Sequence, residues 1–278
     1  MTDGQVIGSH FAAPAPAGDV LVTLENVSKG YPPPPPMRLR RLFSRLGGLH
    51  MEDGFAAEAL AGQVADDEDE MEEGEPLDDA VPSREKLDAG LLIEDVNLEG
   101  TAGSVIALVG PEGSGKTVLL KLIGGLVAPT SGRVVVRGTL APALNLMASV
   151  LPARGHTVKA ALPQLGAMVG LEPRAVRSRF EEIMDLMESP ALLKSSTSLM
   201  ESRRKRELIL AMALSLEPDI LLLDMPIPND AFGDRCVRRL ADLRARGTLV
   251  IAEMRDMRKT RLQPDRIVLL DRGRILSG

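Results

Sequence analysis

The chain has 278 residues, an apolar content of 44%, a net charge of −6 and one cysteine. This length can bury a full core in one large domain or in two small ones. A single cysteine excludes a disulfide framework and fits a reducing cytosol. The longest apolar stretch, residues 208–216, is too short to span a membrane, and the N-terminus lacks the apolar core of an export signal. We therefore expect a cytoplasmic chain.

The N-terminal residues divide into a tail and a strand. Residues 1–18 are rich in alanine and proline and are expected to be disordered. Residues 19–31 alternate apolar and polar positions, with Val20, Val22 and Leu24 on one face. This alternation predicts a strand that ends at the single tyrosine of the chain.

The composition changes abruptly in residues 32–89. Five prolines at 32–36 are expected to form a stiff spacer, and residues 66–79 hold ten acidic side chains in fourteen positions. Such a block cannot bury enough apolar surface to become ordered, so we predict a mostly disordered insertion. Residues 37–46 are predicted to form a short basic amphipathic helix, either a docking peptide for a membrane surface or partner, or a solvated helix that pairs with the acidic block. Since the rest of the chain is near neutral, the charge gives no case for a nucleic-acid partner.

From residue 90 onward the pattern becomes that of one α/β domain. Buried apolar strands alternate with helices, which favours a mostly parallel sheet with helices on its faces. Strands are expected at 104–109, 132–138, 219–224, 248–254 and 265–271, and helices at 116–126, 156–169, 173–188, 202–216 and 231–245. The helices within about 150–215 are expected to form a helical subdomain.

The sequence GPEGSGKT at residues 110–117 matches the phosphate-binding pattern G-x-x-x-x-G-K-[ST] at every fixed position. It lies between a predicted strand and a predicted helix, which is the context that the motif requires. Lys116 is expected to reach the β- and γ-phosphates, and the Thr117 hydroxyl to bind Mg²⁺. The nucleotide-binding residues expected in this loop are Gly110, Glu112, Gly113, Ser114, Gly115, Lys116 and Thr117.

A second motif, ILLLD at residues 220–224, predicts a buried strand that ends in Asp224. This places a carboxylate at the C-terminal edge of the sheet, near Thr117, where it can hold Mg²⁺ through water. We therefore expect Thr117 and Asp224 to be the metal-binding residues.

These motifs, in this order, resemble those of the ATP-binding subunit of ABC transporters, over residues 19–31 and 90–278. The resemblance implies a P-loop NTPase fold, an α/β ABC-type nucleotide-binding domain with a mostly parallel sheet, an antiparallel β portion and a helical subdomain. It implies ATP and Mg²⁺ as cofactors and an adenine that stacks on Tyr31. It also implies two partners, a membrane permease and a second nucleotide-binding subunit, and a peripheral place on the inner face of the cell membrane.

Within this superfamily the chain looks most like the branch that serves capsular polysaccharide, O-antigen and teichoic acid export. The stretches that carry this likeness are residues 119–138 and 190–214.

The chain departs from the family's pattern at positions that serve hydrolysis and coupling. Met225 stands where the family has the glutamate that polarises the attacking water, and Glu253 aligns with the switch histidine. Residues 200–204 replace the signature L-S-G-G-Q, no glutamine occurs in 144–152, and the loop at 227–230 is one residue short. No catalytic residue is assigned.

Three hypotheses fit an intact phosphate loop beside altered hydrolytic positions. The first is the ATP-binding subunit of a glycan exporter that binds Mg·ATP with weak or no hydrolysis. The second is a regulatory or scaffold pseudo-ATPase whose insertion recruits glycan-export or synthesis proteins. The third is an active ATPase that uses an unusual residue, for example Glu253 as its general base.

Overall fold

The structure is a computed structural model, and it describes residues 5–8, 18–30, 91–144, 151, 156–168, 171–254 and 261–277. The chain divides into two compact units, one made of Met1–Lys29 with Ile93–Gly278 and the other of Gly30–Leu92. Apart from the terminal residues of two strands, the second unit lies outside the described residues. The expected insertion at 32–89, its basic helix and the adenine-stacking Tyr31 therefore lie outside them too, and stay predictions.

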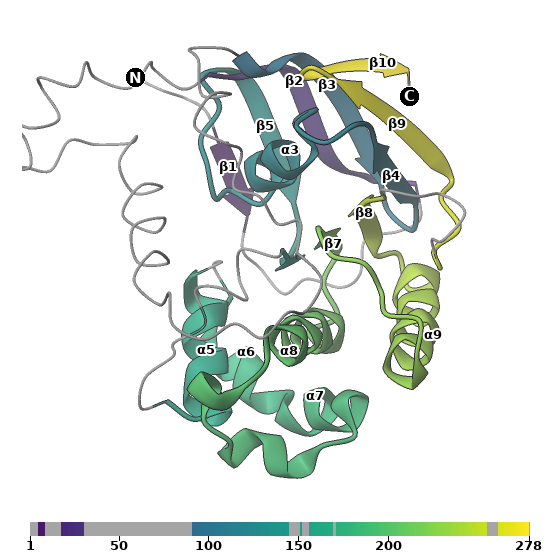
Figure 1. Ribbon diagram of the computed structural model, residues 1–278. Helices are drawn as coiled ribbons and strands as arrows, with labels where there is room; N and C mark the ends of the chain where they lie inside the picture. Colours follow the sequence, from purple (N-terminus) through teal and green to yellow (C-terminus); the bar gives the residue numbers. More distant parts are fainter. Residues whose placement is uncertain are drawn as a thin grey trace, which may run out of the picture. The chain divides into compact units, whose positions relative to one another are not determined.

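Six strands form a sheet in the order β10-β9-β4-β8-β7-β6 (Figure 1). These strands are β4 (Val105–Val109), β6 (Leu140–Ala143), β7 (Ile220–Leu223), β8 (Leu249–Glu253), β9 (Arg266–Asp271) and β10 (Arg274–Ser277). All pairings are parallel except that between β9 and β10. Strands β4, β7 and β8 are nearly continuous runs of buried apolar residues, as expected of strands that are covered on both faces.

A second sheet of four strands has the order β1-β5-β2-β3 and supplies the antiparallel portion of the fold. Its strands are β1 (Gln5–Gly8), β2 (Val20–Gly30), β3 (Leu91–Thr101) and β5 (Ser131–Arg137). β2 runs antiparallel to β5, and β1 runs parallel to it. The buried face of this sheet is aliphatic and includes Val22, Leu24, Ile93, Val96 and Val134.

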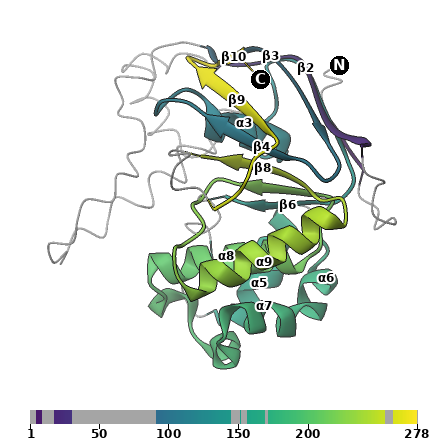
Figure 2. The same ribbon diagram turned by 90° about the vertical axis from the view of Figure 1, so that its right-hand side faces the viewer.

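The helices fall into two groups. Helix α3 (Lys116–Ile123) contacts both β5 and β8, and so it packs between the two sheets. Helices α5 (Val158–Met168), α6 (Pro173–Ser178), α7 (Phe180–Met187) and α8 (Ser202–Ser215) gather beyond the β6 side of the larger sheet, with the 3₁₀ turns η2 (Pro190–Lys194) and η3 (Thr197–Leu199) (Figures 1 and 2). Helix α9 (Ala231–Ala245) packs against α8 and α7. Among the described helices, none has the length and apolar character needed to cross a membrane.

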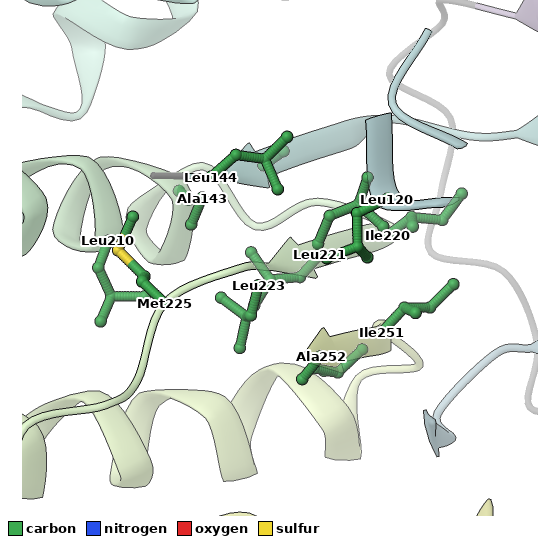
Figure 3. Packing of buried hydrophobic residues seen from close by; sticks show 14 of the residues in the cluster. Leu120, Ala143, Leu144, Leu210, Ile220, Leu221, Leu223, Met225, Ile251 and Ala252 are labelled. Atoms are coloured by element: carbon green, nitrogen blue, oxygen red, sulfur yellow. The ribbon is translucent and has the colours of Figure 1, made fainter. Parts of the chain in front are cut away.

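One aliphatic core runs through these layers. Figure 3 shows Leu221 and Leu223 of β7, Ile251 and Ala252 of β8, and Leu120 of α3 within it. Helix α8 is buried along residues 207–215, which is the pattern of an internal helix rather than an amphipathic one. The core is thus built from leucine, isoleucine, valine, alanine and methionine, as the low aromatic content requires.

The expected architecture is confirmed: a mostly parallel sheet, an antiparallel portion and a helical region at α5–α8. Two local expectations differ from the structure. The helix expected at 173–188 is two helices, because Arg179 leaves the helical region (φ −103°, ψ 9°). The tail expected to be disordered at 1–18 contains strand β1, where the backbone of residues 5–8 pairs with the edge of β5; for these four residues the expectation of disorder was wrong.

Candidate nucleotide-binding site

The loop between β4 and α3 has a backbone path that requires glycine. At Gly110 (φ 158°) an added Cβ would meet the carbonyl oxygen of Leu270 at 2.1 Å. Gly115 (φ 103°) occupies the N-cap position of α3, where no side-chain cap hydrogen bond is made. Gly113 (φ 76°) has open space on its Cβ side. The loop therefore leaves room on one side and presents the N-terminal N–H groups of α3, which is the arrangement that binds phosphate.

Lys116 folds its side chain back over this loop. Its Nζ donates to the carbonyl oxygens of Gly110 and Pro111, both at 2.9 Å, and to Ser114 Oγ at 3.3 Å. The ammonium also lies 3.6 Å from Glu253 Oε1, and the lysine side chain is only 6% exposed. The cation is thus held in the concave side of the loop by backbone oxygens and one carboxylate.

Thr117, Asp224 and Glu253 converge beside this lysine. Thr117 Oγ1 lies 3.3 Å from Asp224 Oδ1 and 3.5 Å from Glu253 Oε2. Asp224 follows β7 directly and Glu253 ends β8, which is the parallel neighbour of β7. Because parallel strands end at the same edge of a sheet, the two carboxylates meet there.

Burial and charge act together on this pair of carboxylates. Burial, together with the hydrogen bond and the charge of Glu253, raises the pKa of Asp224 to about 8. Thr117 and Lys121 act in the opposite direction. The Asp224 carboxyl group and the Thr117 hydroxyl supply oxygen ligands of the kind that a hard divalent cation such as Mg²⁺ prefers, so these residues fit that ion.

Other residues expected to be functional lie elsewhere in the structure. The Glu112 side chain is exposed at the rim of the loop. Met225 is 5% exposed and belongs to the apolar core, and Figure 3 shows its side chain pointing toward Leu210 of α8. The structure therefore brings Lys116, Thr117, Asp224 and Glu253 together, but it does not place Met225 with them.

The segment at the signature position lies at the start of α8, where its arginines are paired within the chain. Arg203 contacts both Glu207 and Asp230, and Arg204 contacts Glu207. Asp230 caps α9 by accepting a hydrogen bond from the Gly233 N–H at 2.9 Å. The start of α8 is thus tied to the short loop at 227–230.

The sequence analysis did not predict a role for Lys121, although its positive charge acts to lower the pKa of Asp224. This position could have been predicted, because Lys121 follows Thr117 by four residues and so lies on the same face of α3. Gly273 was also missed. Its N–H donates to the carbonyl oxygen of Ser114 at 3.0 Å and fixes the loop to the β9–β10 turn, a contact between distant segments that no local pattern reveals.

Residues 93–228 match the family model described as ABC transporter. The O-antigen export system ATP-binding protein RfbB of Klebsiella pneumoniae is 27% identical over 187 residues, which cover 66% of this chain and 75% of that protein. The Fe(3+) ions import ATP-binding protein FbpC 1 of Rhizobium meliloti is 30% identical over 198 residues, which cover 66% of this chain and 55% of that protein. Exporters and importers thus both resemble the chain.

Solved structures with the same fold include a dimeric bacterial ABC transporter cassette, with a TM-score of 0.62 and 18% identity over 92% of this chain and 97% of that one. The ATP-binding subunit of an ABC transporter superposes with a TM-score of 0.59 and 17% identity over 92% of this chain and 88% of that one. These likenesses confirm the expected ABC-type P-loop nucleotide-binding fold. The family model thus matches about half of the chain, and the solved structures share its fold.

Proposed function

We propose that this protein is the ATP-binding subunit of an ABC transporter for polysaccharide or glycan export, and that it binds Mg·ATP with weak or no hydrolysis of its own. The observation that carries ATP binding is the convergence of Lys116, Thr117 and Asp224 at the phosphate loop. In phosphate loops, such a lysine reaches the β- and γ-phosphates, and such a threonine and aspartate hold Mg²⁺. Tyr31 is proposed to stack on the adenine.

The proposal of weak hydrolysis rests on two side chains. Met225 stands at the position of the water-activating glutamate, is buried in the core and has no group that can accept a proton. Glu253, at the position of the switch histidine, is an anion beside Lys116 rather than a neutral or cationic ring. Loss of a positioned general base alone lowers a rate by about 10²–10⁴-fold.

Glycan export is supported by the resemblance to O-antigen export proteins, one of them the RfbB protein of Myxococcus xanthus, at 27% identity over 172 residues. As a transporter subunit the protein would pair with a membrane permease and with a second nucleotide-binding subunit, either a copy of itself or a different chain. It would then lie on the inner face of the cell membrane, held there by the permease.

Nucleotide binding is tested by titrating the full chain with a fluorescent ATP analogue in Mg²⁺, beside Lys116→Ala. We expect saturable binding by wild type and a loss of about 100-fold or more in affinity for the variant, since the lysine contacts two phosphates. Lys159→Ala, which removes an exposed lysine of α5, is the matched control and should bind as wild type does. Absence of binding by wild type at millimolar Mg·ATP would rule the proposal out.

Hydrolysis is tested separately by phosphate release from Mg·ATP under saturating conditions. We expect no turnover above the rate of Lys116→Ala. Steady release that is abolished by Glu253→Gln would instead support an active ATPase that uses Glu253, which lies 3.5 Å from the Thr117 hydroxyl, as its base.

A second candidate function is that of a regulatory or scaffold pseudo-ATPase, favoured by the composition of the insertion at 32–89 with its proline run, basic segment and acidic block. The two functions differ in their partners. Co-purification with a membrane permease supports the transporter subunit, whereas co-purification with glycan-synthesis or regulatory proteins and no permease supports the scaffold.

A further inference from the structure

The Glu253 side chain contacts Lys116 and Thr117, two residues of the phosphate-binding motif. One of its carboxylate oxygens lies 3.6 Å from Lys116 Nζ, and the other lies 3.5 Å from Thr117 Oγ1. The carboxylate is also hydrogen-bonded to Asp224. Its side chain is only 11% exposed, so water screens its charge poorly.

The two groups that Glu253 contacts are those that a phosphate loop uses for the terminal part of a nucleotide. In such a loop the lysine reaches the β- and γ-phosphates, and the threonine hydroxyl would hold Mg²⁺ when the ion is bound. The inner phosphates are held instead by backbone N–H groups of the loop and by the start of the helix. The γ-phosphate of a bound triphosphate would therefore lie toward Glu253, whereas the α- and β-phosphates would lie deeper in the loop.

We propose that Glu253 makes this site discriminate against the γ-phosphate of a nucleotide. The site would then bind a nucleoside diphosphate more tightly than the corresponding triphosphate. The proposal rests on the nucleotide binding proposed above and adds a preference among nucleotides. Glu253 acts in two ways: it competes with the γ-phosphate for Lys116, and it places a negative charge next to that phosphate. A diphosphate also reaches Lys116 through its β-phosphate, but it places no γ-phosphate beside the Glu253 carboxylate.

The opposite role, in which Glu253 holds Mg²⁺ for the triphosphate, predicts the opposite effect of removing its charge. The contacts favour competition over metal binding, because Glu253 already pairs with Lys116 and Asp224 already supplies a carboxylate next to Thr117. The Glu253 carboxylate is thus already the partner of the cation that a γ-phosphate would need.

The test measures the dissociation constants of unlabelled ADP and ATP for the full chain by titration calorimetry, with Mg²⁺ and again with EDTA. The variants are Glu253→Gln, which keeps the shape and removes the charge, and Glu181→Gln, which makes the same change at an exposed position on α7. Wild type should bind ADP about tenfold or more tightly than ATP, the size expected of one unfavourable like-charge contact. Glu253→Gln should bring the two constants within about twofold by tightening ATP alone, while Glu181→Gln should leave the wild-type ratio unchanged.

Equal affinity of wild type for ADP and ATP overturns the inference but leaves nucleotide binding standing. Weaker Mg·ATP binding by Glu253→Gln also overturns it and assigns the carboxylate to the metal. Failure of wild type to bind either nucleotide overturns both the inference and the proposed function. The ratio for wild type does not depend on any substitution, so the inference remains testable even if Glu253→Gln proves unstable.

Discussion

The side chain of Met225 shares the apolar core with the residues of α8, although it stands next to a carboxylate of the candidate site. β7 ends at Leu223, and the chain then leaves the sheet, with Asp224 near Thr117 and Met225 pointing toward Leu210 (Figure 3). Adjacent residues thus serve opposite purposes, one in the site and one in the core. A substitution at Met225 is therefore expected to change the stability of the fold more directly than the chemistry of the site.

We expect Met225→Glu to lower the free energy of unfolding by about 2–4 kcal/mol, because a carboxyl group would enter an apolar environment without a partner there. Met225→Leu keeps an apolar side chain of similar volume and should cost less than about 1.5 kcal/mol. Urea unfolding followed by circular dichroism compares the two. If Met225→Glu is as stable as wild type, the new carboxylate has turned out of the core, and phosphate release should then be measured on that variant.

At the scale of elements, the sequence predicted best where a local pattern determines the structure. The strands β4, β7 and β8 are continuous apolar runs, and α9 begins at the Asp230 cap and spans residues 231–245, as expected. The break between α6 and α7 was not predicted, because apolar positions keep their helical spacing across Arg179. Strand β6 was missed as well, since Leu140–Ala143 is short and contains a proline that is tolerated at the edge of the sheet.

The candidate site, too, could be predicted only where local motifs define its residues. The loop residues and Asp224 follow from motifs, and their meeting follows from the order of strand and helix. The contact between Lys116 and Glu253 depends on β8 lying beside β7, with Leu223 opposite Ala252, and no local pattern states that register. Tertiary pairing therefore supplies the feature on which the nucleotide preference depends.

Glu217 joins three elements through one carboxylate. It lies in the turn between α8 and β7, and it receives Arg179 at 3.2 Å, Arg239 at 3.0 Å and Arg246 at 2.7 Å. Burial acts to raise the pKa of Glu217, but the hydrogen bond from Arg239 and the charges of all three arginines outweigh it and hold the pKa below its usual value. The three arginines come from the start of α7 and from α9 and its C-cap.

Because the folded state lowers this pKa, the ion pairs of Glu217 stabilise the protein above the unfolded-state pKa of glutamate and are lost as pH falls through the folded-state value. We expect Glu217→Gln to lower the free energy of unfolding by about 1 kcal/mol at neutral pH, a modest effect since the group is partly exposed and screened by solvent. The difference from wild type should shrink steadily as the solution is acidified through that range. Glu181→Gln, at an exposed position on α7, controls for the change from a carboxylate to an amide.

At the scale of the whole molecule, the one cysteine of the chain reports on unfolding. Cys236 lies on α9, is fully buried in the core, and burial raises the pKa of its thiol to about 12. A thiol reagent at pH 8 therefore meets neither an exposed sulfur nor a thiolate. Modification requires that the contacts of α9 with α8 and α7 open.

We expect the folded protein to react with a disulfide reagent at pH 8 about a thousandfold or more slowly than the protein in denaturant, because the reactive form is a rare open state.

If nucleotide binds at the phosphate loop and the opening is global, saturating nucleotide at about 100 times its dissociation constant should slow the reaction by a further factor of about 100. Lys116→Ala should lose the effect of nucleotide, measured against the nucleotide-free rate of that variant. Opening of α9 alone would leave the rate independent of nucleotide in wild type too, and rapid labelling of the native protein would contradict the buried position of Cys236. Compared for ADP and ATP, the slowing also ranks the two affinities independently of calorimetry, and the charge of Glu253 predicts the larger effect for ADP at equal concentration.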